Sequence, residues 1–230
     1  MYRYELHLHS GTCSRCSHQT MEEIVQAMVQ KGLAGAVITN HFYHGNTCID
    51  RDLPWRDFVA AFHDDYLYGK KLADEAGVTL LFGIEEGLPE DPGKEVLIYG
   101  VPAEAFARHP ELRSGNLPMI SRFVHGEGGL LLQAHPFRDR AYVQNPNTAP
   151  YADLVDGIEF YNTGNSPEAN AKSMRYAEEH PDMILIAGSD AHRPENVGSA
   201  VIETPVCIRE DADLLRVLRS RNFRCRYAEA

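Results

Sequence analysis

The chain has 230 residues, of which 43% are hydrophobic and 24% are charged, a composition typical of globular proteins. Its 33 acidic residues outnumber its 22 basic residues, so the formal net charge is −11 with neutral histidine. Such a surface repels a phosphate backbone, which disfavours non-specific binding to nucleic acid polymers. No apolar run approaches the roughly 18 residues of a membrane span, and the N-terminus lacks the apolar core of a signal peptide. We therefore expect one globular domain, residues 1–230, in the cytoplasm and without a membrane partner.

Five cysteines at irregular spacing argue against a disulfide framework in a chain of this length. They are Cys13, Cys16, Cys48, Cys207 and Cys225. Cys13 and Cys16 form one C-x-x-C pair, but a four-cysteine zinc site needs a second pair, which the sequence does not contain. We expect the thiols to be reduced.

Short apolar segments alternate with longer helical segments along the whole chain, which indicates an α/β fold. Most of the apolar segments are continuous rather than alternating, as in strands that are buried on both faces. The predicted strands are 4–9, 35–39, 79–84, 95–101, 129–134, 157–161, 183–187 and 200–204. The predicted helices are 20–32, 54–76, 117–125, 167–180 and 211–219, and three loops, 43–53, 86–95 and 138–153, are long enough to be functional.

Seven or eight such units in a chain of this length suit a small parallel barrel, in which functional groups gather at the carboxyl ends of the strands. An open, doubly wound sheet is the competing architecture, and it commonly carries a glycine-rich phosphate loop after its first strand. Here the first strand ends in His7-Leu8-His9 instead, which favours the barrel.

Five of the 11 histidines stand at or just after the ends of predicted strands. They are His7, His9, His41, His135 and His192. The spacing of His7-Leu8-His9 sends both imidazoles to one side of an extended segment, so that they can converge on one ion. Asp190 and His192 have the same spacing. One histidine at a strand end is more often a surface or core residue than a ligand, so the prediction rests on the joint pattern.

Glu85 ends another predicted strand and adds a carboxylate to this set. Imidazole and carboxylate ligands with few thiolates suit zinc, manganese or iron in a catalytic centre. More than four candidate ligands imply two or three divalent ions, which would polarise a phosphoryl group and supply a bound hydroxide near neutral pH. His18 and His44 remain open, whereas His125 lies in an amphipathic helix and is expected at the surface.

The ordered set of strand-end motifs resembles the polymerase and histidinol phosphatase (PHP) domain phosphoesterases over nearly the whole chain. The motifs are His7-Leu8-His9, Ile38-Thr39-Asn40-His41, Gly83-Ile84-Glu85, Gln133-Ala134-His135-Pro136 and Gly188-Ser189-Asp190-Ala191-His192. The resemblance implies a distorted (β/α)7 barrel whose metal site lies at the carboxyl ends of the strands. It also implies three metal positions: the first held by His7, His9, Glu85 and Asp190, the second by Glu85 and His135, and the third by His41 and His192.

The sequence departs from the family pattern in three places. The family often has a histidine or aspartate about six residues after the H-x-H pair, where this chain has Arg15, followed by Cys16 as a thiolate candidate and by His18. The family's further histidine is missing from the segment 95–100, which points to a site of two metals or to one completed by water. Asn40 replaces the usual aspartate before the third motif, which removes a charge but keeps a hydrogen-bond acceptor.

We expect hydrolysis of a small phosphate ester by a metal-activated hydroxide. Asp190 would orient or deprotonate the attacking water, and His192 or His41 would protonate the leaving group. Arg138, Arg193 and Arg15 are candidate clamps for the substrate phosphate, although surface salt bridges would explain each of them equally well.

Two other functions remain open. Hydrolysis of an amide on the same metals, as in amidohydrolase barrels, usually recruits a lysine at a strand end, and the predicted strand ends carry none. A metal-binding protein that has lost catalysis would explain the departures near Arg15 and Tyr99, but the presence of Asp190, Glu85 and all five histidines argues against it.

Overall fold

The computed structural model describes residues 1–227, whose strands form one sheet in the order β7-β6-β5-β4-β3-β2-β1-β8-β9. The strands are β1 (Tyr2–Leu8), β2 (Gly35–Ile38), β3 (Thr79–Gly87), β4 (Glu95–Tyr99), β5 (Leu130–Ala134), β6 (Gly157–Asn162), β7 (Ile184–Gly188), β8 (Ala200–Thr204) and β9 (Arg224–Tyr227). The first eight match the predicted strands to within a few residues. β9 was not predicted, because its sequence, RCRY, contains no apolar run.

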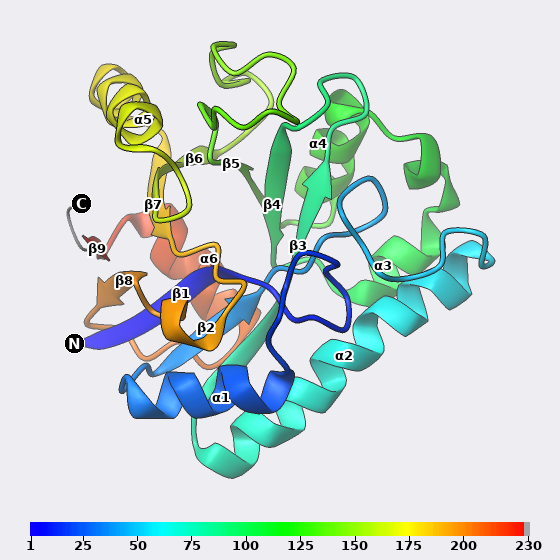
Figure 1. The fold of residues 1–230 in the computed structure, drawn as a ribbon, viewed down its shortest axis with the longest axis vertical. Coiled ribbons are helices and arrows are strands. Elements are labelled where there is room, and N and C mark those ends of the chain that lie inside the picture. The colour runs from blue at the N-terminus through cyan, green and yellow to red at the C-terminus, as the bar shows by residue number, and fades with distance from the viewer. Residues whose placement is uncertain (228–230) are drawn as a thin grey trace.

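Strands β1 to β7 curl into a nearly closed barrel (Figure 1). The remaining gap, between β1 and the residues that follow β7, is bridged by backbone hydrogen bonds. The His9 amide donates to the Ala191 carbonyl at 3.0 Å, and the Ala191 amide donates to the His7 carbonyl at 3.3 Å. Strand order follows chain order throughout these seven strands, without the reversal that defines a doubly wound sheet. The predicted distorted barrel is therefore confirmed.

One barrel strand runs against the others. β4 pairs antiparallel with both β3 and β5, whereas β1, β2 and β3 are mutually parallel, as are β5, β6 and β7. Only residues 88–94 join β3 to β4, and a parallel pair would need a longer crossover. Because β4 is reversed, its first residue, Glu95, lies beside Gly87 and Ala134 at the carboxyl ends of its neighbours.

Helices flank the barrel (Figure 1). They are α1 (Met21–Gln30), α2 (Trp55–Ala76), α3 (Ala103–Arg108), α4 (Leu117–Gly126), α5 (Pro167–Glu179) and α6 (Asp211–Ser220), with 3-10 turns at Pro110–Ser114 and Pro194–Asn196. The five longer helices are those the sequence predicts. Thr20 and Glu23 form a capping box that starts α1, and Gly77, with φ of 73°, ends α2 in the left-handed conformation.

The inside of the barrel is apolar at one end and polar at the other. Leu6, Leu97 and Ile186 of the strands pack in one cluster with Leu214 and Leu218 of α6, which closes that end. The functional groups at the opposite strand ends therefore stand over an apolar core.

An irregularity in β1 turns its side chains toward this polar end. The register of β1 against β2 shifts between Glu5 and Leu8. Leu6 faces the inner cluster, whereas Leu8 packs outward in the cluster that contains Met28 of α1. A bulge of this kind re-aims the following side chains, so His7 and His9 both point into the barrel mouth.

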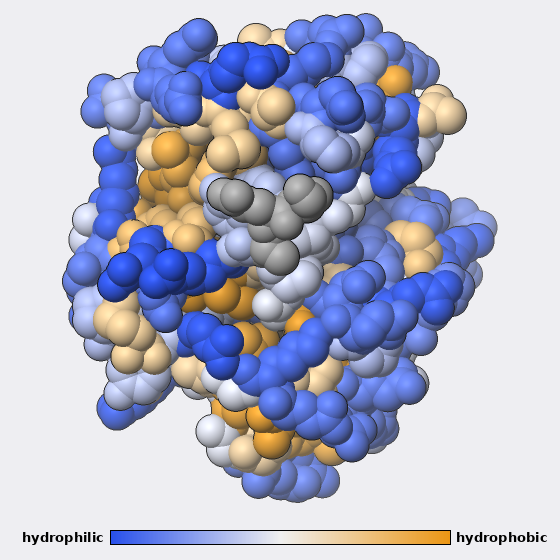
Figure 2. Space-filling view, turned by 60° about the vertical axis from the view of Figure 1, so that its left-hand side comes forward, coloured by the Kyte–Doolittle hydropathy of each residue, from blue (hydrophilic) through white to orange (hydrophobic). Residues whose placement is uncertain are grey.

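The molecular surface is largely hydrophilic (Figure 2). Figure 2 shows a face on which hydrophilic side chains predominate and hydrophobic ones gather in patches toward its middle. Within residues 1–227, no helix combines the length and the apolar character needed to cross a membrane.

Candidate metal centre

Seven side chains from six strand ends converge at the mouth of the barrel. They are His7, His9, His41, Glu85, Glu95, His135 and Asp190, all of them buried except Glu95, whose side chain is 12% exposed. His192, two residues beyond Asp190, borders the same group.

Two imidazoles and two carboxylates meet at the centre. His7 Nε2 lies 3.3 Å from Glu85 Oε1 and 3.4 Å from Asp190 Oδ1. His9 Nε2 lies 3.1 Å from Asp190 Oδ1 and 3.3 Å from Glu85 Oε2. One ligand atom from each of the four lies within 4.8 Å of all the others. The structure therefore brings together the four residues expected at the first metal position.

Glu85 also faces a second group. Its Oε1 is 2.9 Å from His135 Nε2, and its Oε2 is 3.0 Å from His41 Nδ1. Glu95 completes this side, at 3.3 Å from His41 Nδ1 and 3.4 Å from His135 Nε2. Glu85 thus stands between the two groups, where a bridging carboxylate would be needed.

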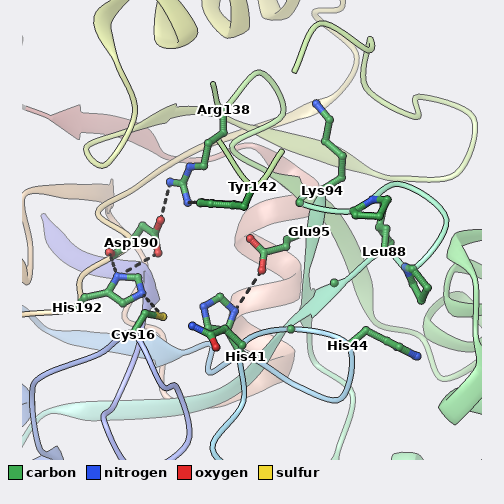
Figure 3. A pocket seen from close by; sticks show the side chains of 16 residues that line it. Cys16, His41, His44, Leu88, Lys94, Glu95, Arg138, Tyr142, Asp190 and His192 are labelled. Carbon is green, nitrogen blue, oxygen red and sulfur yellow. Dashed lines mark hydrogen bonds and ion pairs between the residues drawn. The ribbon is translucent and has the colours of Figure 1, made fainter. Parts of the chain in front are cut away.

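A third group lies at the edge of the centre. Ligand atoms of His9, His41 and His192 lie within 4.8 Å of one another. Cys16 Sγ is 3.0 Å from His192 Nε2. Figure 3 shows Cys16, His41 and His192 on one side of the cleft, with Asp190 beside them.

Buried partners fix the orientation of these side chains. His7 Nδ1 donates to Glu159 Oε1 at 2.9 Å, and Glu159 Oε2 accepts from the His135 amide at 3.0 Å. Glu159 is fully buried in β6. A carboxylate behind an imidazole holds the ring in place and directs its other nitrogen toward the site.

Two of the site residues have backbone conformations that are rare for residues other than glycine. His135 has φ of 28° and Asp190 has φ of 51°. Non-glycine residues with positive φ cluster at functional sites, where the surrounding structure holds them in place. At His135, the hydrogen bond from its amide to Glu159 is one such constraint.

The charges of the centre are strongly coupled. Burial raises the pKa of Glu85, but the neighbouring His7 and His41 outweigh it and hold the pKa well below its usual value. Burial lowers the pKa of His7, but the carboxylates of Glu159, Glu85 and Asp190 raise it well above the ordinary value. For His9, burial and the nearby charge of His41 lower the pKa to about 3. The imidazoles and carboxylates of the centre therefore strongly influence one another's pKa.

The donor set fits a divalent cation. Within residues 1–227, His7 Nε2, His41 Nδ1 and Glu85 Oε2 are buried without a hydrogen-bond partner, although they face one another across the centre. Leaving such atoms unsatisfied is costly, and a cation among them would remove that cost. Imidazole and carboxylate donors suit zinc, manganese or iron.

A cleft of about 600 Å³ opens above the centre, and Arg138 stands in its wall. Arg138 Nη2 donates to Asp190 Oδ2 at 2.6 Å and to Asn162 Oδ1 at 3.0 Å, and Nε donates to Asn165 Oδ1 at 3.0 Å. Burial raises the pKa of the Asp190 carboxyl, but the Arg138 guanidinium outweighs it and holds the pKa well below its usual value. Among the residues that the structure describes, Nη1 has only a long contact, 3.5 Å, to the Tyr142 hydroxyl.

The other two predicted clamps lie elsewhere. Arg15 is exposed, and its Nε donates to the Thr47 carbonyl at 3.1 Å. Arg193 is also exposed, and neither residue lines the cleft. His18 is exposed as well and contributes its backbone amide to the His192 carbonyl at 2.9 Å.

Known proteins share this architecture. Residues 167–223 match the model of the family described as PHP-associated. A two-domain protein from Bacteroides vulgatus, which contains a predicted PHP-like metal-dependent phosphoesterase, superposes with a TM-score of 0.72 at 16% identity, over 98% of this chain and 64% of that one. The chain has the fold of a PHP-like domain.

Two other solved structures share the barrel. A lesion-specific endonuclease from Pyrococcus furiosus has a TM-score of 0.67 at 15% identity, over 95% of this chain and 56% of that one. An amidohydrolase from Chromobacterium violaceum with bound sulfate and no metal has a TM-score of 0.59 at 17% identity, over 93% of this chain and 96% of that one. At these identities the likeness establishes the fold. No curated protein matches the chain.

Sequence reasoning missed two residues of this centre. Glu95 was missed because only a histidine was sought in β4, and Glu95 lies at the site because β4 is reversed. The short connection between β3 and β4, residues 88–94, is the signal that could have revealed this reversal. Glu159 was missed because it lies within a strand, one residue after Ile158, and only the fold places it behind His7.

Proposed function

We propose that the chain is a metal-dependent hydrolase that cleaves a small phosphate ester. The observation that carries the proposal is the cluster of buried imidazoles and carboxylates at the floor of a cleft that has one buried arginine in its wall. The likeness to a PHP-like metal-dependent phosphoesterase supports it.

In this proposal the centre holds two or three divalent ions: zinc, manganese or iron. His7, His9, Glu85 and Asp190 would hold one ion, and Glu85, Glu95 and His135 a second; His41 and His192 border a third position. Bound ions would supply Lewis acidity toward the phosphoryl oxygens and would lower the pKa of a coordinated water.

Residues of the chain would orient the attacking water and protonate the leaving oxygen. Asp190 has one oxygen on the histidine cluster and the other on Arg138, so it is placed to orient the attacking water. His41 and His192 border the cleft and are the candidates to protonate the leaving oxygen. The side chain of His192 is 26% exposed and that of His41 is 8% exposed, so His192 is the more accessible proton donor whenever it holds no metal.

Arg138 is the phosphate-binding residue that the geometry favours. Three hydrogen bonds hold its guanidinium rigid through Nε and Nη2, and Nη1 remains for an anionic ligand in the cleft. A guanidinium group that is held rigid and is always charged is suited to binding a phosphate oxygen. Arg15 and Arg193 would have to swing in from the surface to take part.

The rival substrates are distinguishable. The net charge of −11 argues against a nucleic acid polymer, although a DNA endonuclease shares the fold. An amidohydrolase also shares the fold. Of the cleft residues, only Lys94 is a lysine, and its Nζ donates to the Pro136 carbonyl. In Figure 3 it extends away from the histidines, so it is not placed as a metal-bridging lysine.

The first experiment measures the metal content of the purified protein together with hydrolysis of 4-nitrophenyl phosphate, with and without added manganese. We expect at least two equivalents of metal, and turnover that falls roughly 100-fold or more in Asp190→Asn. Glu178→Gln, an exposed position on α5, is the control and should leave turnover unchanged. Less than one equivalent of metal and no turnover would refute the proposal, and cleavage of duplex DNA without cleavage of the monoester would replace it with a nuclease.

A further inference from the structure

A buried carboxylate of helix α2 reaches the loop behind His9. Asp65 lies in the middle of α2 and is only 6% exposed, and Figure 1 shows the loop that follows β1 beside this helix. Its Oδ2 accepts hydrogen bonds from Ser10 Oγ at 2.5 Å and from Asn40 Nδ2 at 3.1 Å. The proposed metal centre does not use this carboxylate, and burying a charge is costly, so its position calls for another explanation.

Asn40 has only one orientation that satisfies its neighbours. The Ser10 amide donates to Asn40 Oδ1 at 2.7 Å, so this atom must be the oxygen. Nδ2 then faces Asp65, which accepts a hydrogen bond from it. A reversed amide would set nitrogen against the Ser10 amide and oxygen against the carboxylate, and both contacts would be repulsive. Oδ1 is therefore an acceptor for Ser14 Oγ, which lies 3.0 Å away.

The single hydroxyl proton of Ser14 is committed to Asn40. Because Asn40 Oδ1 can only accept, the buried Ser14 hydroxyl donates to it. The two lone pairs of Ser14 Oγ remain for the His41 amide at 3.0 Å and for His9 Nδ1 at 3.2 Å. Since Ser14 can only accept from the ring, Nδ1 is the nitrogen that carries the proton of neutral His9.

A proton on His9 Nε2 would exclude a metal from that atom. Nε2 lies 3.1 Å from Asp190 Oδ1 and 3.3 Å from Glu85 Oε2, and either carboxylate could accept such a proton. Histidine binds a metal only through a deprotonated ring nitrogen. With the proton held on Nδ1 by Ser14, the lone pair of Nε2 points into the centre.

The other imidazole of the H-x-H pair contacts the Glu159 carboxylate directly, whereas His9 reaches a carboxylate only through intermediate side chains. We propose that Ser14 is the positioning residue for His9 and keeps its Nε2 free for a metal. Asn40 and Asp65 fix the direction of the Ser14 hydroxyl, so that a buried charge on α2 acts on the centre through two side chains. This inference rests on the proposed metal centre and not on the identity of the ester.

The position of the His9 proton can be measured without turnover. In metal-free protein labelled with ¹⁵N, the imidazole signals distinguish a ring protonated at Nδ1 from one protonated at Nε2. The His9 signals are assigned by their absence from His9→Gln. We expect the Nδ1 form in the wild-type protein and in Ser14→Thr, which keeps the hydroxyl. In Ser14→Ala, Nδ1 has no acceptor, and we expect the proton at Nε2, where Asp190 Oδ1 accepts it.

Metal affinity, measured by competition with a chromogenic chelator, gives a second readout. Ser14→Ala should bind zinc or manganese about 10- to 100-fold more weakly than the wild-type protein, the usual effect of removing an outer partner of a metal-binding histidine. Ser173→Ala on α5 is the matched control and should keep the wild-type affinity. Ser173 is fully buried, and within residues 1–227 its hydroxyl has no hydrogen-bond partner.

Exchanging the amide and the carboxylate tests the connection from α2. Asn40→Asp alone would set a carboxylate against Asp65, at a contact that is now 3.1 Å, and should weaken metal binding. Asp65→Asn should restore the affinity in the Asn40→Asp background, because an amide then faces a carboxylate again. Additive losses in the double variant would show that the two residues do not act through one another.

The outcomes separate this inference from the proposed function. If folded Ser14→Ala keeps the proton on Nδ1 or keeps the wild-type metal affinity, or if wild-type His9 is protonated at Nε2, the positioning role is wrong and the metal centre stands. If the wild-type protein binds neither zinc nor manganese while Ser14→Ala still moves the proton, the proposed function fails and the placement of the proton by Ser14 stands.

Discussion

Replacing Glu159 by glutamine tests whether the metal centre depends on the buried carboxylate behind it. Glu159 accepts hydrogen bonds from His7 Nδ1 at 2.9 Å, from the His135 amide at 3.0 Å and from Asn162 Nδ2 at 2.8 Å. Glutamine has one oxygen and one NH₂ group, so it cannot accept on both sides. If the NH₂ group faces His7, the proton of that ring moves to Nε2, and the lone pair that points at Glu85 and Asp190 is lost.

The expected loss of metal affinity follows from this geometry. Outer-shell partners of metal-binding histidines are worth 10- to 100-fold in metal affinity, or about 1.4 to 2.8 kcal/mol. If the oxygen faces His7 instead, the His135 amide and Asn162 lose their acceptor, and charge-assisted hydrogen bonds of this kind contribute about 1.5 to 3 kcal/mol each. Either orientation therefore weakens the site.

Competition with a chromogenic chelator measures the change in zinc or manganese affinity of Glu159→Gln against wild type, with the exposed Glu178→Gln as the matched control. Circular dichroism would establish that the variant is folded. An unchanged affinity in folded Glu159→Gln would refute the view that Glu159 orients His7 for metal binding.

Three further predictions follow from the same structure. Glu95→Gln should bind one equivalent of metal fewer, or bind it about ten-fold more weakly, because Glu95 contributes a charge beside His41. Elemental analysis after dialysis would show the loss. A metal content equal to that of the wild-type protein would exclude Glu95 as a ligand. Removal of metal by a chelator should lower the melting temperature, since a ligand present at 100 times its Kd stabilises the fold by about 2.7 kcal/mol. Added zinc or manganese should restore the melting temperature. A melting temperature that changes neither with the chelator nor with added metal would count against a resident metal. Gly157→Ala should destabilise the protein by about 1 to 3 kcal/mol or more, because its Cβ would lie 2.0 Å from the Ile184 carbonyl oxygen. Urea denaturation would measure this, with Gly126→Ala, whose Cβ meets nothing within 4 Å, as the control; equal midpoints for the two variants would contradict it.

Much of the fold is determined locally and could be predicted from the sequence. Continuous apolar segments give eight of the strands, and a capping box at Thr20 and a glycine at 77 bound two of the helices, because these signals act over a few residues. The H-x-H spacing of His7 and His9 likewise gives the direction of two imidazoles from the geometry of an extended chain.

Side-chain direction beyond the strands could not be predicted. Arg15, Arg138 and Arg193 look alike in the sequence, since each lies a few residues past a candidate ligand. Only Arg138 turns into the cleft, because Asn162, Asn165 and Asp190 provide acceptors for it there, whereas Arg15 finds the Thr47 carbonyl at the surface.

Only the tertiary structure decides which distant strands share an end. Glu95 joins the centre because β4 runs against its neighbours, and Glu159 reaches His7 across 152 residues of chain because the barrel nearly closes on itself. The sequence by itself therefore determined the elements and the chemistry of the ligands at their ends. Strand direction, the bulge in β1 and barrel closure decided which of those ligands meet, because these properties depend on pairing between segments that are remote in the chain.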